Sequence, residues 1–245
     1  MNATAYTRYE LLRTFRNRRF LVFSLGFPLA LYALIAVPNR HEQSFGGTGI
    51  SMALYYMVGL ASFGTMMAMV SSGARIANER NTGWTRQLRI TPLTPRAYFR
   101  AKVLTAYAMA LASIATLFAF GIAIGVSLPA GEWAEMTILL LIGLMPFAAL
   151  GILLGHLLNV DSMGPATGGI VSLLALVSGT WFPVAAHGFL HVLALALPSY
   201  WLVQASHVSI GGESWGATGW LVVAGWTVAL TALACVAYRR DGQRV

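Results

Sequence analysis

The sequence predicts an all-α integral membrane protein with six transmembrane helices. Of its 245 residues, 57% are apolar and only 10% are charged, whereas about 25% of residues in soluble globular domains are charged. The charged residues are clustered, and they leave six uncharged runs that reach the ~18 residues a helix needs to cross the hydrocarbon core. Such runs are expected to be helices, because backbone polar groups in lipid must be bonded within their own segment. They comprise residues 20–37, 50–74, 103–128, 136–158, 162–212 and 214–238.

The basic residues predict the orientation. Fifteen of the sixteen lie before residue 20, between residues 75 and 102, or after residue 238, and only Arg40 lies elsewhere. If the runs alternate in direction, the positive-inside rule places these clusters and both termini in the cytoplasm. The run 162–212 is long enough for two spans, but a seventh span would put the C-terminal arginines outside. We therefore expect one span there, followed by an outer re-entrant hairpin from about residue 185 to 212, which Pro183 and Pro198 favour.

The segment before the first run is expected to be an interfacial amphipathic helix. Apolar side chains recur there at helical spacing, and arginines beside them suit the headgroup region. Because Arg8 and Arg16 interrupt the apolar face, a basic tail that only orients the first span is the alternative. The run 20–37 has no Ala-x-Ala exit, which favours a retained anchor over a cleaved signal peptide. No linker divides the chain, so residues 1–245 are expected to form one transmembrane domain. The apolar positions are Ala5, Tyr9, Leu12 and Phe15.

The basic loop between the second and third runs predicts a short amphipathic helix. Trp84 and Leu88 stand four residues apart, arginines occupy other faces, and Pro92 and Pro95 end the helix. The alternative is a solvated loop whose arginines fix the topology and touch anionic lipid.

Three segments resemble the ABC-2 type permeases, the membrane subunits of ABC exporters. One is the opening, residues 9–19 followed by Phe27-Pro28-Leu29. The second is the loop Ile76-Ala77-Asn78-Glu79-Arg80-Asn81-Thr82-Gly83-Trp84, continued by residues 91–95 and Lys102. The third is Ser178-Gly179-Thr180-Trp181-Phe182-Pro183, which is similar to the outer end of the family's fifth span.

The resemblance implies a drug-resistance-exporter-like subunit in a bacterial cytoplasmic membrane. Two such permeases, identical or closely homologous, would work with two ABC ATPase subunits to export a lipophilic or amphipathic substrate. A coupling helix in the first cytoplasmic loop would dock on the ATPase, and membrane lipids would surround the pair. The resemblance assigns ATPase coupling to Glu79, Arg80, Gly83, Trp84, Arg86, Leu88 and Arg89.

ATP hydrolysis is expected to come from another chain. A P-loop needs Gly-x-x-x-x-Gly-Lys-Ser/Thr, because its backbone amides and lysine cradle the phosphates. Lys102 is the only lysine, and it follows Ala101. We therefore expect neither an enzyme site nor a cofactor here, with ATP and Mg²⁺ on the partner. No metal site is expected, because His187 and His191 have no Cys or acid at ligand spacing. Nucleic acid is not an expected partner.

Candidates for a substrate path lie in the second and fifth runs. Flexible thioethers and amphipathic aromatic side chains suit varied lipophilic ligands, and hydroxyl groups offer hydrogen bonds. Ordinary helix packing is the alternative for all of them, because hydroxyls also bond their own helix backbone. The candidates are Tyr55, Tyr56, Phe63, Met66, Ser178, Thr180 and Trp181.

Two other classes of membrane protein fit the sequence less well. A rhomboid-like intramembrane hydrolase would use a serine such as Ser178 with a histidine, but no Gly-x-Ser-x-Gly surrounds it. An ion-coupled secondary transporter usually needs a charge near the bilayer midplane, and the predicted spans have none. The pairs Gly121-xxx-Gly125 and Gly151-xxx-Gly155 predict close helix contacts.

Overall fold

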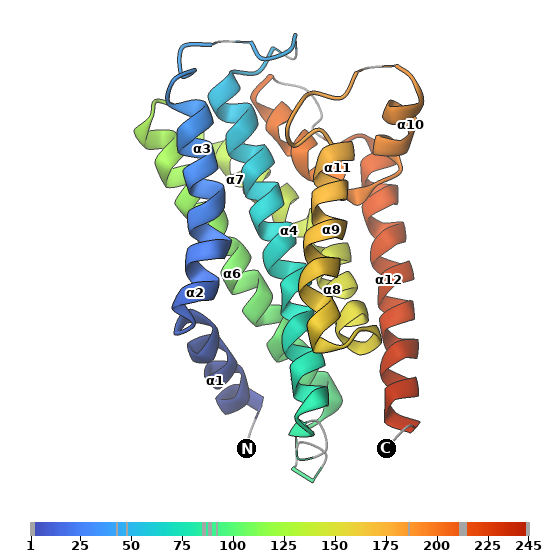
Figure 1. Ribbon diagram of the computed structural model, residues 1–245. Coiled ribbons are helices and arrows are strands. Elements are labelled where there is room, and N and C mark those ends of the chain that lie inside the picture. The colour runs from blue at the N-terminus through green and yellow to red at the C-terminus, as the bar shows by residue number, and fades with distance from the viewer. Residues whose placement is uncertain are drawn as a thin grey trace.

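The computed structural model describes residues 3–42, 44–47, 49–84, 87, 90–91, 93–185, 187–210 and 215–243. All regular elements in these residues are helical, which confirms the predicted all-α class. The helices form an elongated bundle, and both chain termini lie at the same end of it as the C-terminal end of α4 (Figure 1). We call this the inner end. The elements are α1 (Ala3–Phe15), α2 (Arg18–Leu21), the π-helix η1 (Val22–Gly26), α3 (Phe27–Ala36), α4 (Met52–Asn81), α6 (Pro95–Ala123), α7 (Ala130–Gly143), α8 (Met145–Leu157), α9 (Val160–Val177), α10 (Phe189–Leu195), α11 (Pro198–Gln204), the 3₁₀-helix η2 (Ala205–Ile210) and α12 (Ala217–Gln243).

Five helical segments among the described residues are long and apolar enough to cross a membrane. They are α4, α6, the combined α7 and α8, α9 and α12. The described helices therefore confirm an integral membrane protein, while the count of six spans stays a prediction. The first predicted span contains the shorter apolar helix Ser24–Ala36. The segments Phe189–Leu195 and Pro198–His207 form a bent pair at 90°, where the outer hairpin was expected. Such a bend fits a re-entrant hairpin or a broken span.

Polar side chains cap three of the long helices. The Ser51 side chain accepts a hydrogen bond from the Leu54 amide at the start of α4, 3.3 Å away. Thr94 caps α6 in the same way through the Ala97 amide at 3.2 Å, and Asn159 caps α9 through the Ser162 amide at 2.9 Å. Each cap satisfies one of the amides that a helix leaves unpaired in its first turn.

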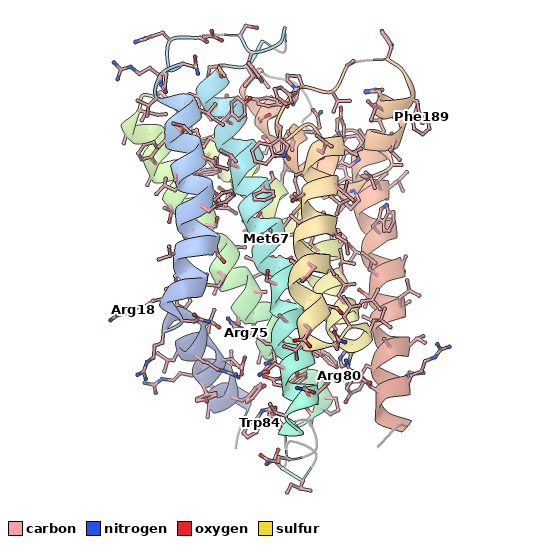
Figure 2. The ribbon with its side chains drawn as sticks, in the orientation of Figure 1. Arg18, Met67, Arg75, Arg80, Trp84 and Phe189 are labelled. Atoms are coloured by element: carbon pink, nitrogen blue, oxygen red, sulfur yellow. The ribbon has the colours of Figure 1, made fainter. Side chains whose placement is uncertain are left out.

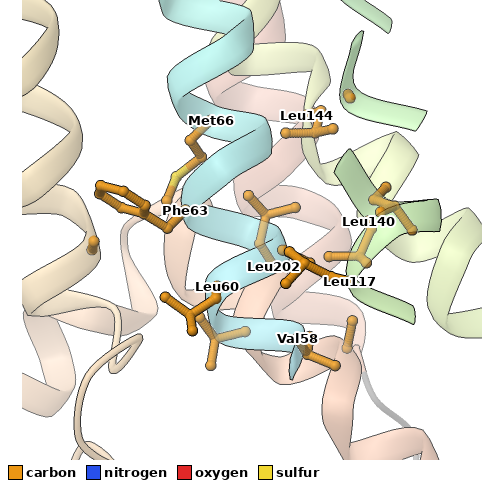
Figure 3. Close-up of a cluster of buried hydrophobic side chains, with 14 of the residues drawn as sticks. Val58, Leu60, Phe63, Met66, Leu117, Leu140, Leu144 and Leu202 are labelled. Atoms are coloured by element: carbon orange, nitrogen blue, oxygen red, sulfur yellow. The ribbon is translucent and has the colours of Figure 1, made fainter. Parts of the chain in front are cut away.

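Helix α4 lies at the centre of the bundle. Figure 3 shows Val58, Leu60, Phe63 and Met66 of α4 among Leu117 of α6, Leu140 of α7 and Leu202 of α11. The long apolar run of the second span is therefore buried in protein on most sides, and its methionines serve mainly as packing. Helices α9 and α12 lie at the periphery and leave most of their apolar side chains exposed, as lipid-facing helices do.

Helices α4 and α8 touch through their backbones at three glycines. A Cβ added to Gly73 would overlap the Gly151 carbonyl oxygen, and one added to Gly155 would lie 2.6 Å from the Gly73 carbonyl oxygen. This confirms the close contact predicted for Gly151-xxx-Gly155. Gly121 of α6 likewise lies against Met57 of α4, whereas Gly125 lies beyond the end of α6 in open space.

Candidate functional site: the charged inner end of the bundle

The candidate site begins where α4 ends. Gly83 follows the last turn with φ of 70°, a left-handed conformation that glycine adopts without a Cβ clash and that commonly ends a helix. Trp84 comes next, is 37% exposed and lies near the inner end of the bundle (Figure 2). The chain therefore leaves helix α4 here, and the indole of Trp84 is partly exposed at the protein surface.

A buried charge cluster joins α1, α4 and α6, and we call it the Lys102 cluster. Its members are Glu10, Glu79 and Lys102, with Arg13 and Tyr98 beside them. The Lys102 Nζ lies 2.9 Å from Glu10 Oε2 and 2.5 Å from Glu79 Oε1. The Tyr98 hydroxyl donates to Glu79 Oε2 at 2.6 Å, and Arg13 Nη1 lies 3.5 Å from Glu79 Oε1.

The three central side chains of this cluster are only 1–2% exposed. Buried charges are tolerated only when they are paired and hydrogen-bonded, because their desolvation is costly. One ammonium group between two carboxylates, with Tyr98 and Arg13 in support, meets that requirement. The cluster therefore depends on all three helices being in place.

Helix α1 has its polar side inward and its apolar side outward. Tyr6, Glu10 and Thr14, four residues apart, are buried, whereas Tyr9 and Leu12 are more than half exposed. The apolar face predicted from the sequence thus points away from the protein, as an interfacial helix would require. Burial, together with the nearby carboxylates of Glu79 and Glu10, raises the pKa of Tyr6, so its phenol stays neutral.

A second polar cluster joins α4, α8 and α12, and we call it the Asp241 cluster. Its members are Arg80, His156 and Asp241. The Arg80 guanidinium grips the Asp241 carboxylate bidentately, with Nε 2.5 Å from Oδ2 and Nη2 2.8 Å from Oδ1. The His156 Nδ1 lies 2.8 Å from the same Oδ2.

Arg80 also completes the end of α8. Its Nη1 donates to the carbonyl oxygens of Gly155 at 3.0 Å and Leu158 at 3.3 Å. Carbonyls at the end of a helix lack partners within the helix, and a basic side chain commonly supplies one. Phe99 of α6 closes the cluster, with its ring centroid 4.9 Å from that of Tyr238 on α12 and 6.0 Å from that of His156.

The structure divides the predicted coupling residues into three groups. Glu79 and Arg80 lie in the last turn of α4, and the contacts described above hold them within the chain. Gly83 forms the turn, and Trp84 lies partly exposed beyond it. Arg86, Leu88 and Arg89 lie outside the described residues. Coupling through these residues remains a prediction.

Most of the predicted substrate-path residues gather where the outer half of α4 meets the chain that follows α9. The Tyr55 hydroxyl donates to the Gly179 carbonyl oxygen, and the Tyr56 hydroxyl donates to the Trp181 carbonyl oxygen at 2.8 Å. The rings of Phe63 and Trp181 lie 5.6 Å apart between centroids. These contacts hold the end of α9 against α4 in the conformation seen.

The other three candidates are buried. Met66 lies among apolar side chains of the core, and Ser178 and Thr180 have almost no exposed surface. The Ser178 hydroxyl donates to the Ala175 carbonyl oxygen at 3.2 Å and lies 3.4 Å from the Thr180 hydroxyl. Its contacts are therefore those of a helix end rather than of a serine nucleophile beside a histidine.

The roles of Glu10, Lys102 and Asp241 in these clusters were not predicted from the sequence. Lys102 did carry a signal, because it is the only lysine and directly precedes an uncharged run, where an ammonium group needs a partner. Its partners could not be read from spacing, since Glu10 is 92 residues away. The Arg80–Asp241 pair spans 161 residues and has no local signature.

Comparison with known proteins identifies the family of this chain. Residues 37–237 match the model of a family described as ABC-2 family transporter protein. A protein of Bacillus subtilis (strain 168), whose provisional name is transport permease YvfS, is 30% identical over 179 residues, which cover 71% of each chain. The match to the family model covers most of the chain, including the α4, α6 and α8 members of the two clusters, whereas Glu10 and Asp241 lie outside the matched range. The chain therefore belongs to the ABC-2 family of transporter proteins, as a transport permease.

Proposed function

We propose that the chain is the membrane-spanning subunit of an ATP-driven ABC-2 exporter whose energy comes from a separate ABC ATPase subunit. The observation that carries this proposal is the inner end of α4, where a buried and a partly exposed polar cluster are followed directly by a turn and a partly exposed tryptophan. A partner that binds the loop at Trp84 would act on a helix end that is joined to four other helices. The lack of a P-loop lysine supports placing ATP and Mg²⁺ on that partner.

The functional assembly in this proposal is two permease chains with two ATPases. Exposed apolar side chains on α9 and α12 leave room for lipid or for a second permease copy. The substrate class is lipophilic or amphipathic, drug-like or lipid-like. The aromatic and hydroxyl side chains between α4 and the end of α9 are its proposed contacts, and they would separate when the path opens. Rigid-body movement of helices is the proposed mode of opening.

Truncating Trp84 tests the coupling loop. Because indole side chains that anchor interfaces contribute about 2 kcal/mol or more, Trp84→Ala should weaken association with the ATPase about thirtyfold. We also expect substrate-stimulated ATP hydrolysis to be lost, with a larger effect when Leu88→Ala is added. Co-purification of the ATPase and the hydrolysis rate are the measurements.

The matched control is Trp220→Ala. Trp220 is 46% exposed, similar to Trp84, but lies in the first turn of α12 at the other end of the bundle. This variant should bind the ATPase as the wild-type chain does. If Trp84→Ala keeps wild-type transport with the ATPase bound, the loop is not the coupling element.

Cysteine labelling tests the proposed location in a bacterial cytoplasmic membrane with both termini inside. In a Cys235→Ser chain, cysteines at Asn81 and Arg240 should resist an impermeant thiol reagent in intact cells, whereas one at Glu135 should react. This is expected because the basic residues cluster in the segments predicted to be cytoplasmic and because both termini lie at the same end of the bundle (Figure 1). Reaction of the Arg240→Cys chain from outside, without permeabilisation, would exclude this topology.

A further inference from the structure

The C-terminal helix α12 is bonded to α4 at the inner end by the Asp241 cluster. Along its length α12 packs against α8, through a small apolar cluster of Ala149, Leu153, Leu230, Ala234 and Ala237. The bidentate bond between Arg80 and Asp241 thus connects α12 to the central helix directly. A fork-to-fork arginine–carboxylate pair fixes orientation as well as distance.

The last turn of α4 connects to the bundle in two directions through consecutive residues. Side chains of neighbouring residues on a helix point about 100° apart. Glu79 faces α1 and α6 in the Lys102 cluster, and Arg80 faces α8 and α12 in the Asp241 cluster. The chain leaves the helix only a few residues later, at Gly83. A displacement of the loop therefore reaches both clusters over less than two helical turns.

We infer that Asp241 is a positioning residue, which through Arg80 makes the inner ends of α4, α8 and α12 move as one unit when the loop after α4 is displaced. Three guanidinium nitrogens of Arg80 are occupied, by Asp241 and by two carbonyls of α8. His156 and the Phe99 and Tyr238 rings fill the space around the pair. The Arg80–Asp241 pair is packed among side chains as well as hydrogen-bonded, so a displacement of α4 is transmitted to α8 and α12. This inference rests on the proposed function, because the ATPase supplies the displacement.

The first test is Asp241→Asn in the permease assembled with its ATPase. The variant loses the charge on the acceptor but keeps the size of the side chain. We expect the ATPase to co-purify normally and to hydrolyse ATP within about twofold of the wild-type rate. Transport per ATP should fall about tenfold, which lies within the usual range of coupling between two sites. A purely structural role would instead lower assembly, hydrolysis and transport together.

Asp161→Asn is the matched control. Asp161 is an exposed acid in the first turn of α9, so its substitution removes the same charge without touching the cluster. It should keep the wild-type ratio of transport to ATP hydrolysis. If Asp241→Asn also keeps that ratio, the inference is overturned.

A second measurement does not depend on the transport assay. Spin labels at Asn81 and Arg239, both exposed, report the distance between the ends of α4 and α12 in a Cys235→Ser chain. With Asp241 present, this distance should be the same in the nucleotide-free and the ATP-trapped complex; in Asp241→Asn it should differ between the two. An equal change of distance in both chains would contradict the inference. If the wild-type chain binds no ATPase at all, the proposed function fails, and this inference fails with it.

Discussion

Lys102→Met is expected to produce a permease whose inner end no longer folds stably. The substitution leaves the carboxylates of Glu10 and Glu79 buried without the ammonium group that lies 2.9 Å and 2.5 Å from them. Removing one partner from a buried ion pair typically costs about 3–5 kcal/mol. Arg13 compensates only in part, because its side chain is largely outside the cluster and 3.5 Å or more from either carboxylate. We expect the melting temperature of the purified permease to fall by on the order of 10 °C.

Two further variants show whether the ion cluster causes this loss. Arg100→Met removes an exposed cation from the same helix and should change stability by no more than about 0.5 kcal/mol. The double variant Lys102→Met, Glu10→Gln removes one charge of each sign and leaves Glu79 with Arg13 and Tyr98, so it should recover part of the loss. Equal melting temperatures for Lys102→Met and Arg100→Met would show that the cluster contributes nothing to stability.

Gly73→Ala is expected to prevent α4 and α8 from packing. Its single added methyl group would overlap the Gly151 carbonyl oxygen, a backbone atom that cannot move away as the end of a flexible side chain could. Overpacking of this kind typically costs about 1–3 kcal/mol, and more where the backbone must shift. Because α4 is the central helix and Gly73 lies one to two turns before Glu79 and Arg80, both polar clusters should loosen as well. Tryptophan fluorescence during heating, with recovery after gel filtration, measures the effect.

Gly225→Ala is the matched control for this substitution. Gly225 lies within α12, and nothing stands within 4 Å of a Cβ built there. Alanine is the better helix former by about 0.8–1.0 kcal/mol, so this variant should be at least as stable as the wild-type chain. If Gly73→Ala melts at the same temperature as Gly225→Ala, the helices do not approach as closely as the structure shows.

The distribution of charge along the sequence was sufficient to predict the fold class but not the helix ends. The second run was expected to cover residues 50–74, yet α4 continues to Asn81. The predicted span ends before Arg75, the first charged residue, because a charge is costly in lipid. The helix itself continues because Glu79 and Arg80 have partners on other helices. Helix α6 likewise begins at Pro95, before Lys102 and the run that starts at residue 103. A hydropathy pattern indicates whether a segment lies in lipid or in water, but not which helices it contacts.

Local irregularities could be predicted only in part. Pro183 and Pro198 indicated a break on the outer side, where the bent pair of helices lies. The π-helix Val22–Gly26 inside the first apolar segment had no signal in the spacing. Its extra residue per turn shifts the faces of the helix around Pro28, which packs against Gly64 of α4.

The candidate site was predicted as a position in the chain but not as a set of contacts. The resemblance placed Glu79, Arg80, Gly83 and Trp84 in a loop that acts on a partner. The structure places the first two in a helix with their side chains turned inward and leaves Trp84 exposed at the surface. Spacing gives the faces of one helix, whereas the direction of a charged side chain depends on partners that are 19 to 161 residues away on other helices. Those partners become visible only when the helices are assembled.

The ion pairs of the inner end can form only in a fixed order during synthesis. Helix α1 is made before α6, so Glu10 on its buried face has only the more distant Arg13 until its closest counter-ion, Lys102, is added 92 residues later, roughly 5–20 s at the usual rates of translation. The ion pair of Arg80 forms later still, because Asp241 follows it by 161 residues. The chain can therefore insert its helices one by one, but the inner end closes only after Asp241 has been made. A chain that stops before Asp241 would leave Arg80 without its carboxylate, so truncated permeases should be open at this end and accessible to quality-control proteases.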